Sequence, residues 1–343
     1  MIKKNLLSMA ALALLASAAQ AQVTVYGNVD LSVGRTEFTT GDKSVTAVES
    51  GVNTGSYFGL KGEEDLGGGL KAFFALESDI AADTGSVDGN FWGRTSELGL
   101  TGGFGTVKLG NSRSLGFLAN AAYNPFPVTG LLNTSEAINA YGNRANAITY
   151  TSANLSGLTL AAQLAMSETD GVSDAKAVSA NYVAGPLSLG FTYSTEETGV
   201  VDGLVGLFGV LPDAVAADVV ASVTDVNVDM DRWQLGAGYD FGSFKLFGQY
   251  AQNKFKGNGG SAKTKFYQLG AAVPVSAAGT VMASYANQKF DDADAKVRDF
   301  SLAYDHALSK RTSAYVAYKA LRVNVDGEKD TLNAFAVGVK HAF

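Results

Sequence analysis

The last thirteen residues, Thr331 to Phe343, limit what this chain can fold into. Every second residue is bulky, and the residues between them are small or charged. The bulky set is Phe335, Val337, Val339, His341 and Phe343. A lysine flanked by small residues suits a wide, water-filled lumen better than the surface of a soluble sheet. Because a terminal strand must pair with the first strand to remove both sheet edges, we expect a closed barrel.

The same alternation recurs along the chain, for example over Leu187–Ser194 and Trp233–Phe241. Short glycine-rich turns and longer polar connections follow the strands in turn, and residues 38–53 form the first of the long connections. This layout predicts an all-β, antiparallel transmembrane barrel of about sixteen strands. A soluble β-sandwich is the alternative, but it would have fewer and shorter strands per domain.

The first residues have the features of an export signal. Lys3 and Lys4 precede an apolar run from Leu6 to Ala19, and the small-x-small pattern at Ala19-Gln20-Ala21 is typical of a secretory cleavage site. The run is short for a membrane anchor and lacks a basic flank after it. We therefore expect a cleaved signal peptide at residues 1–21 and a mature barrel at residues 22–343.

Charge and composition exclude several classes of protein. Removing the signal takes the formal charge from −7 to −9, whereas nucleic-acid binding needs a basic face. The chain has no cysteine, and its two histidines, His306 and His341, have no evident Ser or Asp relay. We expect neither an enzyme nor a cofactor. Asp291, Asp292 and Asp294 are interpreted as solvated loop charges, the alternative being a divalent-cation site.

The segment of residues 111–145 lacks sustained alternation and contains Pro125 and Pro127. Loops of this length are usually functional or disordered, and its apolar residues favour packing. We expect it to fold into the lumen as a constriction loop, the alternative being an external flap. Its one carboxylate is Glu136. A second unusual stretch, residues 200–222, is apolar and is interpreted as a loop packed on itself or a contact surface over the mouth.

Several motifs resemble one family. They are SYFGLKGEEDLGGGLKAFFALES at Ser56–Ser78, ELGLTGGFGTVKLG at Glu97–Gly110, NRANAITYTS at Asn143–Ser152, HALSKRT at His306–Thr312 and the terminal GVKHAF. Together they resemble the general porins of Gram-negative outer membranes, of the type found in Burkholderia, Comamonas and Neisseria. The resemblance covers essentially the whole mature chain. It implies a sixteen-stranded barrel, a homotrimer and a third long loop folded into the lumen.

The resemblance also implies roles for particular residues. Arg94 and Arg144 match family arginines of the pore constriction. Tyr57 and Asn111 stand where the family often has arginine, and Arg113 is a candidate replacement for the second of these. The basic side of the constriction is thus thinner than usual, which weakens the case for strong anion selectivity.

The C-terminus provides a further resemblance. Gly338, His341 and Phe343 resemble the terminal recognition pattern of outer-membrane barrels. This pattern implies the barrel assembly machinery and outer-membrane lipid as partners.

Charges in the lumen would govern permeation. If the loop narrows the lumen, Glu136 facing Arg94, Arg113 and Arg144 would set a transverse field that selects ions. Four lysines share the lumen-facing parity and could extend the basic side: Lys61, Lys71, Lys108 and Lys340. The alternative for each lysine is a solvated wall residue with no selective role.

These observations predict a passive outer-membrane channel for ions and small hydrophilic solutes. A substrate-specific channel would need ladders of aromatics or paired charges, whereas Tyr26, Phe247 and Phe266 are scattered. A structural barrel with a blocked lumen would need a plug or passenger domain.

Overall fold

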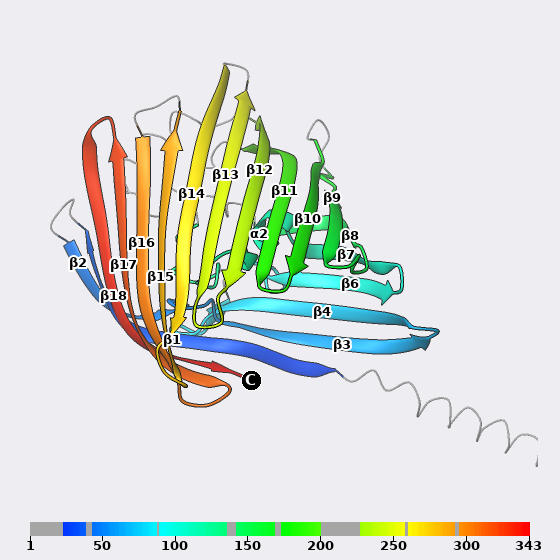
Figure 1. Ribbon diagram of the computed structural model, residues 1–343, viewed down its shortest axis with the longest axis horizontal. Helices are drawn as coiled ribbons and strands as arrows, with labels where there is room; N and C mark the ends of the chain where they lie inside the picture. Colours follow the sequence, from blue (N-terminus) through cyan, green and yellow to red (C-terminus); the bar gives the residue numbers. More distant parts are fainter. Residues whose placement is uncertain are drawn as a thin grey trace, which may run out of the picture.

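The protein folds into one antiparallel β-sheet that closes on itself as a barrel (Figure 1). The computed structural model describes residues 23–38, 43–87, 89–135, 142–168, 173–199, 227–257, 260–291 and 295–343. No helix among these residues has the length and apolar character needed to cross a membrane. The predicted signal peptide at 1–21 and the apolar stretch at 200–222 lie outside the described residues.

The described residues form eighteen strands and the helix α2, at Leu115–Ala122. The first nine strands are β1 (Thr24–Phe38), β2 (Lys43–Ser50), β3 (Tyr57–Gly67), β4 (Leu70–Ala81), β5 (Ser86–Val87), β6 (Thr95–Gly102), β7 (Gly105–Arg113), β8 (Asn143–Thr151) and β9 (Leu158–Ala165). The other nine are β10 (Ala175–Ala184), β11 (Leu187–Gly199), β12 (Asn227–Asp240), β13 (Lys245–Gly257), β14 (Gly260–Pro274), β15 (Gly279–Phe290), β16 (Ala295–Ala307), β17 (Thr312–Val325) and β18 (Glu328–Ala342).

These strands occupy sixteen positions around the barrel. Strand β2 pairs with the second half of β1 and β3 with its first half, so together they fill one position. Strand β5 is a two-residue extension beside the end of β4. Strand β18 pairs with β1 from Asn28↔Ala342 to Phe38↔Leu332 and closes the ring. The predicted closure by the terminal strand and the predicted number of strands are both confirmed.

One sequence expectation was wrong. Residues 38–53 were expected to be a connection, but residues 43–50 form β2. Its apolar residues Val45 and Val48 are three apart, so the segment lacks the period-two pattern by which strands are recognised. The backbone hydrogen bonds to β1 nevertheless place it in the sheet.

The two faces of the sheet differ as the alternation predicted. Outward side chains are apolar and exposed, for example Leu235, Leu269 and Val337. The neighbouring inward residues Gln234 and Gln268 are buried, because other parts of the chain fill the lumen beside them. An apolar exterior around a polar interior is the arrangement of a barrel that spans a membrane.

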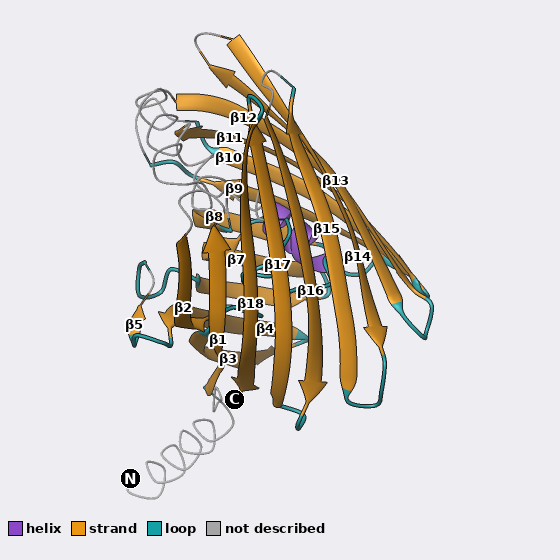
Figure 2. Cartoon of the chain, turned by 90° about the vertical axis from the view of Figure 1, so that its left-hand side faces the viewer, coloured by secondary structure: helices purple, strands orange, loops and turns teal. Residues whose placement is uncertain are grey.

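The connection between β7 and β8 lies inside the barrel. Figure 2 shows helix α2 enclosed by the strands. Ser114 caps the helix by accepting a hydrogen bond from the Phe117 N–H at 3.0 Å. The Tyr123 ring then seats on two wall glycines, because a Cβ at Gly190 or Gly236 would approach it to 2.6 Å or 2.0 Å. We name residues 114–135 the inserted loop.

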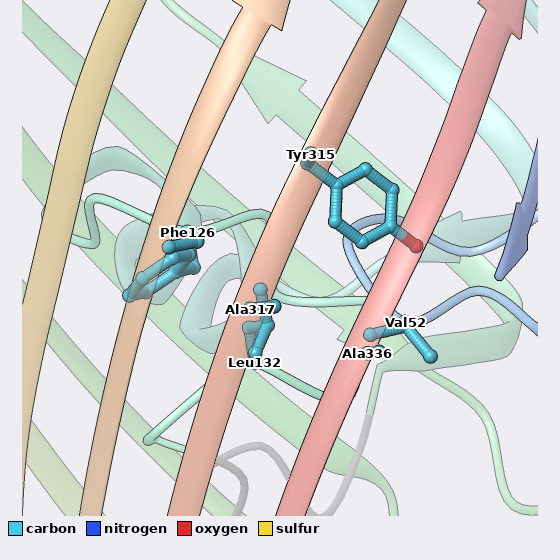
Figure 3. Packing of buried hydrophobic residues seen from close by; sticks show 7 residues of the cluster. Val52, Phe126, Leu132, Tyr315, Ala317 and Ala336 are labelled. Carbon is cyan, nitrogen blue, oxygen red and sulfur yellow. The ribbon is translucent and has the colours of Figure 1, made fainter. Parts of the chain in front are cut away.

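A second, shorter insert, formed by residues 51–56, lies between β2 and β3. The N–H groups of Leu131 and Leu132 in the inserted loop donate to the carbonyls of Gly51 and Val52, each at 3.2 Å. A hydrophobic core joins both inserts to β16, β17 and β18 (Figure 3). Its members are Val52, Phe126, Leu132, Ala303, Tyr315, Ala317 and Ala336. This cluster therefore lies inside the lumen, against β16, β17 and β18.

The carboxylate of Asp30 holds the shorter insert in place. It is fully buried, and it accepts hydrogen bonds from the N–H groups of Asn53 and Thr54, each at 2.7 Å. The Tyr315 hydroxyl donates to its other oxygen at 2.7 Å. The Tyr315 ring reaches Asp30 by passing over Gly338, where a Cβ would lie 2.4 Å from the ring. Gly338 therefore has a packing role in the fold.

We predict that Asp30→Ala destabilises the barrel by roughly 3 kcal/mol, because it leaves two buried N–H groups and a hydroxyl without their acceptor. Tyr315→Phe removes one of the three bonds and should cost about 1 kcal/mol. Urea unfolding of the protein in lipid vesicles measures both changes. Ser78→Ala, a buried change on β4 that removes a 3.5 Å hydrogen bond to the Asp79 carbonyl, is the control. Equal midpoints for Asp30→Ala and Ser78→Ala would contradict the prediction.

Candidate pore constriction

A cavity of about 640 Å³ lies between the inserted loop and the opposite wall. On the wall side it is lined by Glu49, Asp79, Asp83 and Arg94, among others. On the loop side the lining residues are Phe117, Val128, Thr129 and Leu131. The inserted loop contributes no charged residue to this cavity, so its electrostatics come from the wall.

Arg94 is held in the wall by three contacts. Its guanidinium stacks on the Tyr57 ring at 4.1 Å. Its Nε lies 3.0 Å from Glu77 Oε2 and its Nη1 lies 2.6 Å from Asp79 Oδ1. Only 12% of the side chain is exposed. Tyr57, one of the two positions where the resemblance implies an arginine in many relatives, therefore supports Arg94.

Two asparagines fix the backbone before Arg94. The Nδ2 groups of Asn111 and Asn143 both donate to the Gly93 carbonyl, at 2.7 Å and 2.5 Å. Asn143 Oδ1 in turn accepts from Arg113 Nη1 at 2.9 Å. Asn111 thus positions the segment that presents Arg94.

Arg113 belongs to the same neighbourhood. Its guanidinium lies over the Phe117 ring at 4.5 Å, and it is within electrostatic reach of Arg94, Glu77 and Asp79. The structure thus brings Arg94 and Arg113 together. That Arg113 stands in for an arginine at position 111 stays a prediction.

Arg144 lies apart from that group. Its Nη2 is 2.5 Å from Glu196 Oε2, and the two side chains are 13% and 4% exposed. It lines a separate, small cavity beside the start of α2, together with Gln163 and Arg232. Arg144 is therefore neutralised by a buried partner away from the cavity that Arg94 lines.

Carboxylates that the sequence patterns did not assign to the constriction dominate the cavity. Glu136 lies outside the described residues, so the expected pairing with it is not observed. Glu77 and Asp79 share the lumen-facing parity of β4, and this parity was a signal that could have identified them. Glu49 and Asp83 offered no such signal, because neither lies in an alternating stretch. Among the described residues, Glu49, Asp79 and Asp83 line the cavity with Arg94, while Glu77 reaches Arg94 from beside it.

The four predicted pore-lining lysines also have partners on the wall. Lys71 pairs with Glu63 at 2.6 Å, Lys108 with Glu97 at 2.8 Å and Lys340 with Asp305 at 2.7 Å, while Lys61 lies 4.5 Å from the centre of the Tyr26 ring. The described part of the chain holds no cluster of three or more potential metal ligands. Asp292 and Asp294 are not among the described residues.

Known proteins match the chain along its length. A family model described as Gram-negative porin matches residues 8–326. Outer membrane porin protein 32 of Delftia acidovorans is 33% identical, covering 100% of both chains. The anion-selective porin from Comamonas acidovorans superimposes with a TM-score of 0.79 at 30% identity, covering 94% of this chain and 100% of that one.

A more distant structure has the same fold. The trimer form of OmpT of Vibrio cholerae gives a TM-score of 0.68 at 14% identity, covering 94% of this chain and 99% of that one. The full-length sequence matches and the superimposed barrels agree with each other. The chain therefore belongs to the family of Gram-negative porins, the non-enzymatic channels of the outer membrane.

Proposed function

We propose that this porin is a general-diffusion channel whose selective passage lies between the inserted loop and the wall of β2–β6. The observation that carries the proposal is the cavity of about 640 Å³ there, lined by an arginine and several carboxylates. Fixed charges beside a narrow aqueous passage sort solutes by charge without a specific binding site. Passage of small hydrophilic solutes follows their gradients and needs no cofactor.

The lumenal aromatics support this interpretation over a substrate-specific channel. Phe266 is only 2% exposed and packs with Ala251 and Ala286, so it offers no surface to a solute. The Tyr26 ring lies below Lys61, and its hydroxyl donates to Glu77 at 2.6 Å. Among the described residues, aromatic rings therefore form no continuous track along the lumen.

We expect single-channel recordings in planar bilayers to show a conductance that rises in proportion to salt concentration. Saturation by one sugar or amino acid at low concentration would instead favour the substrate-specific channel.

The channel is also proposed to be a homotrimer, by analogy with Vibrio cholerae OmpT, which has been solved in a trimer form. Each insertion should then close in three equal steps. Single-step closures would contradict the trimer.

The charges of the constriction favour cations modestly. The Comamonas acidovorans relative is an anion-selective porin. Here Arg94 is bound by Glu77 and Asp79, and Glu49 and Asp83 line the same cavity. Three carboxylates against one arginine line the cavity, which leaves a negative balance among its described lining residues. We therefore infer that this channel lacks strong anion preference.

Reversal potentials under a salt gradient test this inference. Arg94→Ala should shift the potential further toward cations, and Glu77→Gln with Asp79→Asn should shift it toward anions. The shifts should be largest near 0.01 M salt, where the screening length is about 30 Å, and vanish near 1 M, where it is about 3 Å. Arg35→Ala is the control, because Arg35 is exposed and pairs with Glu37 on the outer face of β1. Identical potentials for all variants at low salt would contradict the assignment.

We further propose that the chain is exported through the signal at residues 1–21 and inserted by the barrel assembly machinery, which reads the C-terminal strand. The exposed Phe343 ring supports this, because the backbone of Phe343 already pairs with Gly27 while the ring remains accessible. Gly338 also carries a fold role, since it makes room for Tyr315. A change at Phe343 therefore tests recognition by the assembly machinery, whereas a change at Gly338 also affects folding.

Phe343→Ala should lower the amount of protein in the outer membrane but leave refolding into lipid vesicles almost unchanged. Gly338→Ala should impair both, because the added methyl group collides with the Tyr315 ring. Phe335→Ala removes another exposed aromatic from the same strand and is the matched control. Equal losses in cells for Phe343→Ala and Phe335→Ala would show that the terminal position carries no recognition signal.

A further inference from the structure

A pocket of about 300 Å³ lies at the loop end of β16, β17 and β18. Four basic side chains line it: Lys296, Arg298, Arg322 and Lys329. We name these four residues the basic pocket. Val323, Asn324, Asp330 and Thr331 complete the lining.

The basic pocket faces outward, away from the lumen. On β16 the exposed Arg298 shares its parity with Phe300 and Leu302, which are exposed on the outer face. Asp299, between them, is buried on the lumenal side. The cross-strand register sets Arg298 opposite Arg322 and Lys296 opposite Asn324, which in turn faces Lys329. The sheet thus gathers the four cations on one outer patch.

This arrangement is unfavourable without an anion. Like charges directly opposite each other on neighbouring strands repel. None of the four forms an ion pair within the described part of the chain, whereas Lys265 on the neighbouring outer surface pairs with Asp291 at 2.7 Å. Asp330 is the one carboxylate in the lining, and it accepts a hydrogen bond from the Thr331 N–H at 2.8 Å. A chain with a formal charge of −7 has nevertheless concentrated four cations here.

The height of the basic pocket matches the polar surface of a membrane. The Phe300 and Tyr318 rings lie below it, with centroids 6.5 Å apart. Outward aromatics mark the membrane–water interface of such barrels. Arg298 is two residues beyond Phe300 and Arg322 four beyond Tyr318, which corresponds to about 7 Å and about 13 Å along a strand. The long connections of the barrel are on this side, so this is the outer surface of the outer membrane.

We propose that the basic pocket binds the phosphorylated headgroup of a lipid in the outer leaflet. The arginines provide paired donors that fit phosphate oxygens, and the lysines add two point charges. A lipid is favoured over free phosphate because apolar outer residues continue directly below the pocket. Leu302 and Val316 are 40% and 42% exposed there and would contact the acyl chains. The proposal rests on the outer-membrane location and is independent of what permeates the lumen.

Native mass spectrometry of the detergent-purified full-length mature protein tests the proposal. The probes are diphosphorylated lipid A, its dephosphorylated counterpart and inorganic phosphate. The parent should bind the phosphorylated lipid. Arg298→Gln with Arg322→Gln should bind it about 25-fold more weakly, since each surface arginine contributes roughly a fivefold preference for an anionic lipid surface. Arg35→Gln with Lys265→Gln removes the same charge from outer-face residues that already have carboxylate partners, and it should bind like the parent.

Three results would overturn the proposal. The first is equal affinity of the parent and the Arg298→Gln, Arg322→Gln variant for the phosphorylated lipid. The second is equal binding of the dephosphorylated lipid, which would mean apolar contact alone. The third is full displacement of the lipid by an equal concentration of inorganic phosphate, which would assign the pocket to a free anion. Channel conductance equal to that of the parent verifies that each variant is folded, because the changed residues lie on the outer face.

Discussion

The interior of this porin depends on one buried carboxylate. Asp30 on β1 binds two backbone N–H groups of the shorter insert and the hydroxyl of Tyr315 on β17. The shorter insert is bonded to the inserted loop, so Asp30 contributes to holding the loop in place. A buried charge of this kind persists when its hydrogen bonds are complete. Barrel closure and the shape of the passage are therefore two results of the same set of contacts.

The barrel wall has glycines at the points where the inserted loop packs closely against it. Gly190 and Gly236 leave room for Tyr123, and Gly270 leaves room for Pro125. Opposite this seat, arginines and lysines are paired with carboxylates a few ångströms away. Such pairs produce a field that falls off faster than that of a basic wall facing an acidic loop. On one side of the lumen the inserted loop packs against the wall through apolar contacts. On the other side, basic side chains are neutralised by carboxylates of the wall.

Much of the architecture could be predicted from alternation alone. The terminal strand predicted closure, because its bulky and small faces have a period of two and a sheet edge cannot remain open in lipid. The inward placement of the 114–135 segment was predictable from its apolar residues and its length. Residues 43–50 could not be recognised as a strand, because pairing with β1 places them in the sheet while their own pattern does not.

The charge pairs of the site were harder to predict. Parity places Glu77 and Asp79 on the lumenal face, but it does not reveal that both reach Arg94, which lies in a connection without alternation. The hypothesis of a transverse field used Glu136 because it is the one acid in residues 111–145. The partners that the structure does reveal come from neighbouring strands, and single-sequence patterns contain no information about such contacts.

The hydrogen bond between Tyr315 and Asp30 also bears on the order of folding. Its two residues are separated by 285 positions, so loop closure over nearly the whole chain must precede it. Until β17 and β18 have joined β1, Asp30 lacks the Tyr315 hydroxyl as a donor, whereas its bonds to the Asn53 and Thr54 N–H groups span only 23 and 24 positions. Ring closure therefore completes the hydrogen bonds of a carboxylate that already holds the shorter insert. A chain truncated before Tyr315 would keep the two N–H bonds and leave Asp30 Oδ1 open to water.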